Sequence, residues 1–258
     1  MTTISMPAPP AAVGIVYLRP QSLSEILSGA LHLMRGHFWR LVGVFLVATI
    51  PARLMTIYGQ ETHSIELVLA GLFLLLAAII FVQPMLTVMV GDICRGMRPS
   101  LKRAISLTFR RLPVIFVNSL LVLLIFAAGF IFFVVPGVIA LVQLMFVAPV
   151  STLEEKRWGV AAIRRSRQLG LGYHWRSFRL LLLMSVLGFA LGLVSLPVRL
   201  LVQAIPGAAW IDPLVENFVQ GVAQIFGLIS SVLLYYELRA RKEGLTPDVL
   251  MQDLRAGF

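Results

Sequence analysis

The sequence predicts an all-α membrane protein, a polytopic helical bundle of six transmembrane helices arranged as three hairpins. Of its 258 residues, 59% belong to the hydrophobic set and only 13% are charged, whereas an ordinary soluble domain has roughly 45–50% and 25%. The charged residues lie between long apolar runs, and a short amphipathic helix followed by a hairpin occurs three times. Six spans of about 20 residues would occupy about 120 positions, so we expect no soluble catalytic domain.

Uncharged apolar runs predict the six spans. They lie at residues 41–58, 67–90, 113–135, 137–153, 178–197 and 214–236. The fourth span is the shortest, because residues 137–150 cover only about 21 Å of helix, against a hydrocarbon core of about 30 Å. A re-entrant hairpin is therefore the alternative there. Two full crossings are favoured, since residues 113–150 contain no charge and Pro136-Gly137 is a turn signal near their middle.

Basic residues are distributed unequally between the two sides of this bundle. Twenty of the 22 Lys and Arg residues lie on the side of the chain termini, and only Arg53 and Arg199 lie toward the other side. The positive-inside rule therefore predicts a multi-pass membrane protein whose N-terminus and C-terminus are cytosolic. Residues 1–20 are interpreted as a flexible cytosolic leader, and residues 246–258 as a short cytosolic helix or tail.

Three repeat units make up a single transmembrane domain over residues 21–245. The units cover residues 21–92, 99–153 and 157–240. Each begins with a short helix whose apolar residues recur at helical spacing, and Ser22 and Glu25 predict a capping box at the start of the first. The sequence GHFWR at 36–40 is echoed by GYHWR at 172–176. We expect the amphipathic helices to lie at the cytosolic headgroup boundary or under the bundle.

Basic residues on and beside the second and third amphipathic helices predict contact with anionic lipid headgroups on the cytosolic side. These residues are Arg103, Arg110, Arg111, Arg164, Arg165, Arg167 and Arg176. Such charge is also typical of any inner-leaflet loop, so a specific headgroup pocket and a general orienting charge both stay open. The net charge of +10 does not indicate nucleic-acid binding, because short loops lack the folded basic surface that it requires.

Polar side chains inside the apolar runs are the candidates for a functional path, because each is costly in lipid without a partner. They are Gln83, Asn118, Gln143, Asn217, Gln220 and Gln224. The last three form a polar stripe on the sixth span that faces the bundle interior. Interhelical hydrogen bonds and an intramembrane substrate path are the two interpretations. Gly188 and Gly192 form a small-residue face that predicts close helix packing on the fifth span.

No catalytic or metal-binding constellation is found in the sequence. Cys94 is the single cysteine, which excludes an intrachain disulfide and a cysteine-rich metal site. The histidines lack metal-ligand spacing, since His32 and His37 are five residues apart and two ligands on one helix face are four apart. Glu154 and Glu155 are consecutive loop residues and do not form a catalytic pair. We therefore expect a non-enzymatic protein without a metal or cofactor.

Four groups of residues resemble a known family. They are Leu18-Arg19-Pro20 with Ser24-Glu25-Ile26-Leu27, Pro136-Gly137 with Pro149 and Glu154, Ala162-Ile163-Arg164-Arg165-Ser166 with Gly172 and Trp175-Arg176, and Tyr235-Tyr236-Glu237-Leu238-Arg239 with Arg241-Lys242-Glu243-Gly244. The chain resembles bacterial proteins described as the membrane domain of glycerophosphoryl diester phosphodiesterase, a six-span group mostly of unassigned function. The resemblance implies this architecture in the bacterial plasma (inner) membrane, with Arg164, Arg165 and Arg176 as structural signatures at the cytosolic interface.

In some members of that family the membrane region is fused to a soluble, metal-dependent phosphodiesterase domain. The histidine, carboxylate and metal constellation of that domain has no matching positions here, so the resemblance implies no such activity. We expect an accessory or scaffold subunit of a membrane complex or of lipid-related metabolism, with membrane lipids and a protein partner. The alternative is a transporter or lipid-translocating protein that uses the polar residues of the spans.

Overall fold

The computed structural model describes residues 21–132, 134–154 and 158–244. The leader expected at residues 1–20 and the tail expected at 246–258 lie outside these ranges. Within them every regular element is a helix, and six segments are long and apolar enough to cross a membrane. This confirms the predicted all-α, six-span fold of a multi-pass membrane protein.

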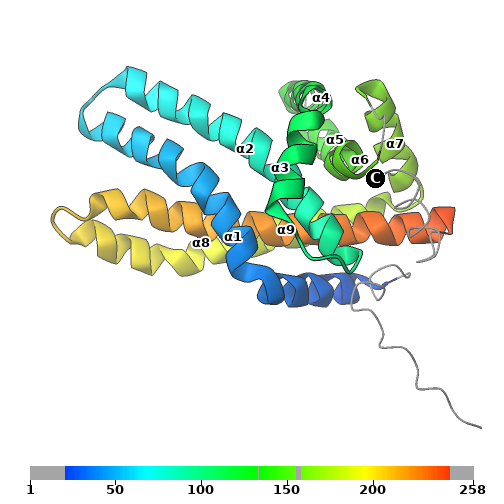
Figure 1. Ribbon diagram of the computed structural model, residues 1–258. Coiled ribbons are helices and arrows are strands. Elements are labelled where there is room, and N and C mark those ends of the chain that lie inside the picture. Colours follow the sequence, from blue (N-terminus) through cyan, green and yellow to red (C-terminus); the bar gives the residue numbers. More distant parts are fainter. Residues whose placement is uncertain (1–20, 133, 155–157, 245–258) are drawn as a thin grey trace, which may run out of the picture.

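The first unit is the hairpin of α1 (Leu23–Glu61) and α2 (Ile65–Cys94), drawn in blue and cyan in Figure 1. The predicted capping box is present: the Ser22 hydroxyl accepts a hydrogen bond from the Glu25 backbone N–H, and the Glu25 carboxylate accepts one from the Ser22 N–H. The amphipathic helix and the first span form one bent helix. Non-helical backbone at His37 (φ −129°, ψ 18°) makes the bend.

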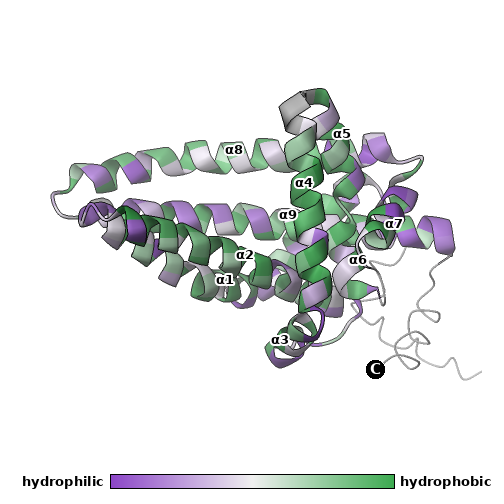
Figure 2. Ribbon diagram, turned by 90° about the horizontal axis from the view of Figure 1, so that it is seen from above, coloured by the Kyte–Doolittle hydropathy of each residue, from purple (hydrophilic) through white to green (hydrophobic). Residues whose placement is uncertain are grey.

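The second unit contains α3 (Leu101–Arg110), α4 (Leu112–Phe132), α5 (Val134–Leu144) and α6 (Val147–Leu153). A turn at Met145 and Phe146 divides the predicted fourth span into α5 and α6. Two glycines let α4 and α5 approach, because a Cβ on Gly129 would lie 3.0 Å from the Gly137 Cα. The axis of α4 runs across the direction of the long helices (Figure 1 and Figure 2), so this hairpin differs in orientation from the first.

The third unit contains α7 (Val160–Gly170), α8 (His174–Ala204), the single turn η2 (Ala209–Ile211) and α9 (Asp212–Glu243). Positive φ values at Gly159 (51°) and Gly172 (82°) set the turns on both sides of α7, a conformation that glycine adopts without strain. α9 ends at Gly244, whose left-handed backbone (φ 59°) is typical of a helix C-terminus. Hydrophilic residues gather at α7 and at the end of α9 (Figure 2).

The best-packed part of the core surrounds the last third of α9. Residues 232–238 are all buried, so this stretch is covered on every side, and α1, α2, α7 and α8 all contact α9. We call this the packed end of the bundle. At the opposite end, which we call the open end, α1 and α2 are joined by residues 62–64, and α8 and α9 by residues 205–211. The two hairpins diverge toward that end (Figure 1).

Candidate functional site: a cavity between two hairpins

A cavity of about 600 Å³ lies between the first and third hairpins, with walls from α1, α2, α8 and α9. We call it the hairpin cavity. Its polar lining consists of Arg53, Ser185, Ser195, Arg199, Glu216, Asn217, Gln220 and Gln224. Its large apolar lining residues include Phe45, Leu75, Ile79, Leu181 and Met184. Exposed lining residues, among them Gly192 and Gln220, leave the cavity open to the surroundings.

An ion cluster closes the α8 and α9 side of the cavity near the open end. Arg199 donates from Nε to Asp212 Oδ1 over 2.6 Å and from Nη2 to Glu216 Oε2 over 3.3 Å. Gln203 donates to the other Asp212 oxygen over 2.9 Å, and Gln220 donates to Glu216 Oε1 over 2.8 Å. Both oxygens of Asp212 and both oxygens of Glu216 therefore have protein partners, and the positive charge of Arg199 has two carboxylate counter-ions.

Asn217 ties α9 to α1 beside this cluster. Its Nδ2 donates to Thr49 Oγ1 over 3.0 Å, and the Thr49 hydroxyl donates in turn to the Phe45 carbonyl over 2.9 Å. Asn217 and Thr49 are both buried. The polar stripe of α9 had two interpretations, interhelical hydrogen bonds and a substrate path. For Asn217 the structure shows an interhelical hydrogen bond.

Two polar groups of the lining have no such partner. The Nε of Arg53 is buried without a hydrogen bond, and within the described ranges its guanidinium forms no hydrogen bond or ion pair. The Gln224 amide likewise has no hydrogen-bond partner among the residues that the structure describes. Arg53 as a whole is partly exposed, but a buried polar atom without a partner is costly, so its Nε marks a place in the cavity that is suited to a ligand or to water.

The prediction of close packing at Gly188 and Gly192 is wrong. A Cβ on either residue would meet no atom within 4 Å, because both face the hairpin cavity. The close helix contact lies at Gly221 on α9, where a Cβ would lie 2.6 Å from the Phe45 ring of α1. A small-residue spacing identifies a smooth helix face, but the neighbouring helix decides whether that face is filled.

The structure brings together three of the six predicted path residues, Asn217, Gln220 and Gln224, and places the other three elsewhere. Asn118 donates to Ser151 Oγ over 2.7 Å and accepts from the Gly159 N–H over 2.6 Å, which joins α4, α6 and the start of α7. Gln83 lies on α2 and Gln143 on α5. Neither lines the hairpin cavity, so the six residues do not form one continuous path.

The packed end holds a second polar cluster, centred on α9. Glu154 accepts from Arg165 Nε over 3.0 Å and from the Tyr235 hydroxyl over 2.9 Å. Arg165 also pairs with Glu243, which accepts from Arg239 Nε over 2.9 Å. Burial alone would lower the pKa of Arg165, but the nearby Glu154 and Glu243 carboxylates outweigh it and hold that pKa above its ordinary value.

Glu237 is the most deeply buried carboxylate of this cluster, with a side chain that is 0% exposed. It pairs with Arg176 over 3.3 Å and with Arg241, and both guanidinium groups also donate to the Gln21 carbonyl. The role of Glu237 was not predicted from its position in the sequence. The signal that could have identified it is an acidic residue placed directly after the apolar run of the sixth span and beside the basic residues that follow it.

The other buried acid at the packed end is Asp92 on α2, which lies 3.6 Å from Arg103. Next to it, Arg95 donates to the Tyr236 hydroxyl over 3.1 Å. Arg111 donates to the carbonyls of Thr152 and Glu154, each over 2.9 Å. These contacts tie α2, α3 and α6 into the packed end.

Four of the seven arginines expected at anionic lipid are thus held by groups of the protein itself: Arg103, Arg111, Arg165 and Arg176. The remaining three, Arg110, Arg164 and Arg167, are exposed. Contact with anionic headgroups therefore stays a prediction for these three residues. For the other four, the structure provides carboxylate or carbonyl partners within the fold.

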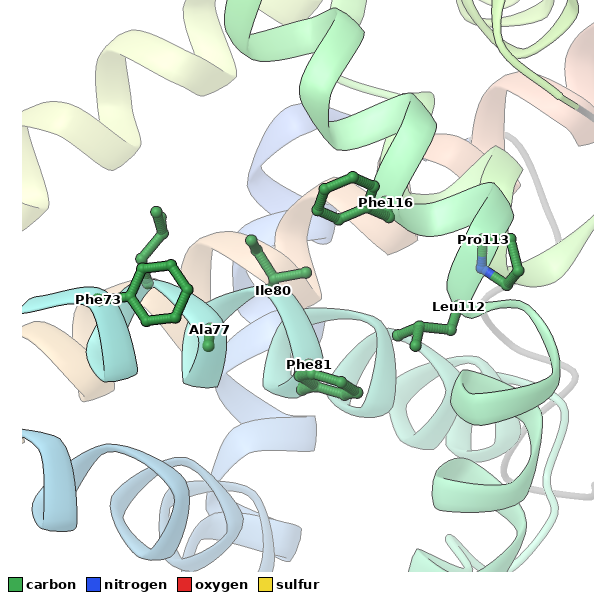
Figure 3. Close-up of a pocket in the computed structure, with 8 residues that line it drawn as sticks. Phe73, Ala77, Ile80, Phe81, Leu112, Pro113 and Phe116 are labelled. Carbon is green, nitrogen blue, oxygen red and sulfur yellow. The ribbon is translucent and has the colours of Figure 1, made fainter. Parts of the chain in front are cut away.

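A separate groove of about 450 Å³ lies on the surface between α2 and α4 (Figure 3). Phe73, Ile80, Phe81 and Phe116 line it, and all of its lining side chains are apolar. Such a surface fits an acyl chain or an apolar helix and offers no polar group that would select between them.

In the parts of the chain that the structure describes, no group of three or more His, Cys, Asp or Glu side chains could hold a metal ion. The fold and these sites define a class, the multi-pass helical membrane proteins. No family model, curated protein or solved structure matches the chain.

Proposed function

We propose that this chain is a non-enzymatic protein of the bacterial inner membrane that binds an amphiphilic molecule in the hairpin cavity. In this proposal it serves as an accessory or scaffold subunit in lipid-related metabolism or in a membrane complex. The observation that carries the proposal is the polarity of the cavity. The charged side chains Arg53, Arg199 and Glu216 line it toward the open end, whereas Phe45, Leu181 and Met184 line it toward the packed end, with the Gln224 amide among them.

The order of charged and apolar residues along the hairpin cavity matches the order of polar and apolar parts in an amphiphile. Arg53, Arg199 and Glu216 lie on the parts of their helices near the open end, whereas Phe45 and Leu181 lie nearer the packed end. A headgroup would therefore meet polar partners while its chain stays in an apolar environment. Ligand sites commonly have volumes of about 300–1,000 Å³ and a few placed polar groups in a mostly apolar lining.

The distribution of basic residues supports an orientation with the packed end in the cytosol. α3, α7 and the end of α9 lie toward that end and carry nine of the 18 Lys and Arg residues in the described ranges, whereas only Arg53 and Arg199 lie near the open end, and cytosolic segments are rich in such residues. In this orientation the exposed Arg110, Arg164 and Arg167 would face the anionic headgroups of the inner leaflet. The cavity would then open toward the outer leaflet.

A transporter or lipid-translocating protein is the second candidate, and the polar lining favours it. Asn217, Gln220 and Gln224 would then be steps of a path across the membrane. Residues 232–238 fill the bundle at the packed end, so translocation would require α9 to move away from α1 and α2.

Membership of the glycerophosphoryl diester phosphodiesterase membrane-domain family is also a proposal. Its support is that three of the four groups of residues behind the resemblance meet at one place. Glu154, Arg165, Arg176 and Glu237 all belong to the polar cluster of the packed end. In this proposal the shared residues serve the fold and not a reaction.

Native mass spectrometry with lipid analysis of the gently solubilised protein tests the function. We expect a bound amphiphile on the wild type and several-fold less of it on the double variant Gly188→Leu with Gly192→Leu, whose new side chains would enter the cavity. Ala190→Leu, at an exposed position of α8 that does not line the cavity, is the matched control. Equal retention by all three proteins, or no bound amphiphile on the wild type, would contradict the proposal.

A further inference from the structure

The charges that line the hairpin cavity do not cancel in pairs. Arg199 is matched by Asp212 and Glu216, and the second Glu216 oxygen accepts from Gln220. Arg53 faces this cluster from α1 with no carboxylate of its own in the described part of the chain. The guanidinium of Arg53 stays protonated and has no ion-pair partner in the described part of the chain, although the four charges of Arg53, Arg199, Asp212 and Glu216 sum to zero.

The position of Arg53 along α1 is also suited to binding an anionic headgroup. It lies eight residues before the end of α1 at Glu61, which is about 12 Å along the helix. Its Nε is buried and has no acceptor. A phosphate in the cavity would give the guanidinium the acceptor that it lacks, and Arg binds phosphate with two parallel hydrogen bonds.

The apolar lining continues from Arg53 toward the packed end. Phe45 lies two helical turns before Arg53 on the same helix, a separation of about 12 Å, and Leu181 and Met184 of α8 line the same cavity. The Gln224 amide lies on α9 between Gly221, which faces Phe45, and Gly227, which faces Met184. It is therefore beside the apolar lining and not between that lining and Arg53.

We propose that the hairpin cavity is a binding site for an anionic glycerophospholipid, with the phosphate on Arg53 and an acyl chain along Phe45, Leu181 and Met184. This inference rests on the proposed function and adds the class of ligand and the residue that selects it. The cavity volume of about 600 Å³ accommodates a headgroup and part of one chain. The rest of the lipid stays in the bilayer.

The test is a lipid titration followed by native mass spectrometry, with the full chain in a neutral detergent. The probes are phosphatidylglycerol, diacylglycerol of the same acyl chains, and glycerol phosphate without chains. We expect phosphatidylglycerol to bind wild type about 10-fold to 100-fold more tightly than diacylglycerol, which lacks the phosphate and therefore one charge-assisted hydrogen-bonded pair. Glycerol phosphate should bind much more weakly, since it lacks the chain.

Arg53→Gln should remove the preference for phosphatidylglycerol and leave the affinity for diacylglycerol unchanged, whereas Arg53→Lys should keep part of the preference. Arg110→Gln, which removes the same charge from an exposed position of α3, is the matched control and should keep all of it. The unfolding temperature of each variant separates a binding defect from a folding defect, and the wild-type comparison of the two lipids does not depend on any variant.

Equal binding of the two lipids by wild type would overturn the headgroup assignment and leave the proposed function in place. A loss of both lipids in Arg53→Gln would show that Arg53 has a structural role and would equally overturn it. Tight binding of glycerol phosphate would overturn the assignment of the acyl chain. The proposed function itself fails only if neither lipid binds, or if the two Gly→Leu substitutions in the cavity leave both affinities unchanged.

Discussion

The Tyr235 hydroxyl donates a 2.9 Å hydrogen bond to Glu154 Oε1, which joins α9 to the residue after α6 across 81 positions of the sequence. Tyr235 is fully buried, and Arg165 binds both oxygens of the same carboxylate over 3.0 and 3.1 Å. One carboxylate thus holds a helix of the second unit, a helix of the third unit and the central helix together.

Tyr235→Phe should destabilise the protein, because it removes a buried donor to a charged acceptor and changes little else. Hydrogen bonds to charged groups contribute about 1.5–3 kcal/mol to the free energy of unfolding. Thermal unfolding in detergent measures the effect. Tyr58→Phe, at an exposed ring with 60% of its surface accessible, is the control and should change stability by less than about 0.5 kcal/mol.

Glu237→Gln should be more destabilising than Tyr235→Phe. It leaves Arg176 and Arg241 at a buried site without their shared counter-ion, and removing one partner of a buried pair costs about 3–5 kcal/mol. Because the two arginine side chains are 16% and 31% exposed, we expect a loss near the lower bound. Chemical unfolding of the variant measures it.

A double-mutant cycle of Glu237→Gln with Arg176→Gln distinguishes this pairing from a general loss of packing. Groups in direct contact show coupling energies of about 0.5–3 kcal/mol, so the double variant should be less destabilised than the two single losses added together. Arg164→Gln, at an exposed position of α7, should show no coupling with Glu237→Gln. Additive losses for the Arg176 pair would contradict the assignment of a central ion pair.

Local sequence patterns predicted the elements that depend on local interactions. The capping box at Ser22 and Glu25 and the short helix α3 follow from residues within one or two helical turns of each other. The ion pairs between different helices of the packed end were not predicted in the same way, because residues such as Arg176 and Glu237 are distant in sequence and only the tertiary fold brings them together. Charge near an apolar run indicated a membrane interface, but not which arginines would be used internally.

The hairpin cavity was predicted only in part, because most of its walls come from helices that are distant in sequence. The stripe of Asn217, Gln220 and Gln224 follows from helical periodicity, and it lines the cavity as expected for an interior face. The opposite walls come from α1, α2 and α8, so neither the open space at Gly188 nor the missing partner of Arg53 is encoded in the pattern of any one helix.

Two glycine substitutions should have effects of opposite sign. Gly221→Ala places a Cβ 2.6 Å from the Phe45 ring, and overpacking of this kind costs about 1–3 kcal/mol. Gly192→Ala meets no atom within 4 Å and should stabilise α8 by up to about 1 kcal/mol through its higher helix propensity. Unfolding temperatures of the two variants test the contrast, and a shift of the same sign in both would mean that the two helix surfaces are packed alike.

The orientation of the bundle can be tested with two introduced cysteines. The variants are Gln60→Cys and Ser106→Cys. Gln60 lies near the end of α1 at the open end, and Ser106 lies on the outer face of α3 at the packed end. Both positions are exposed. The native Cys94 is buried, and burial raises the barrier to its reaction with a maleimide. In cells with an intact inner membrane, an impermeant maleimide should label Gln60→Cys and should label Ser106→Cys only after permeabilisation.

The unsubstituted protein is the control for background reaction at Cys94. Labelling of Ser106→Cys alone before permeabilisation would reverse the orientation and would assign the hairpin cavity to the cytosolic leaflet.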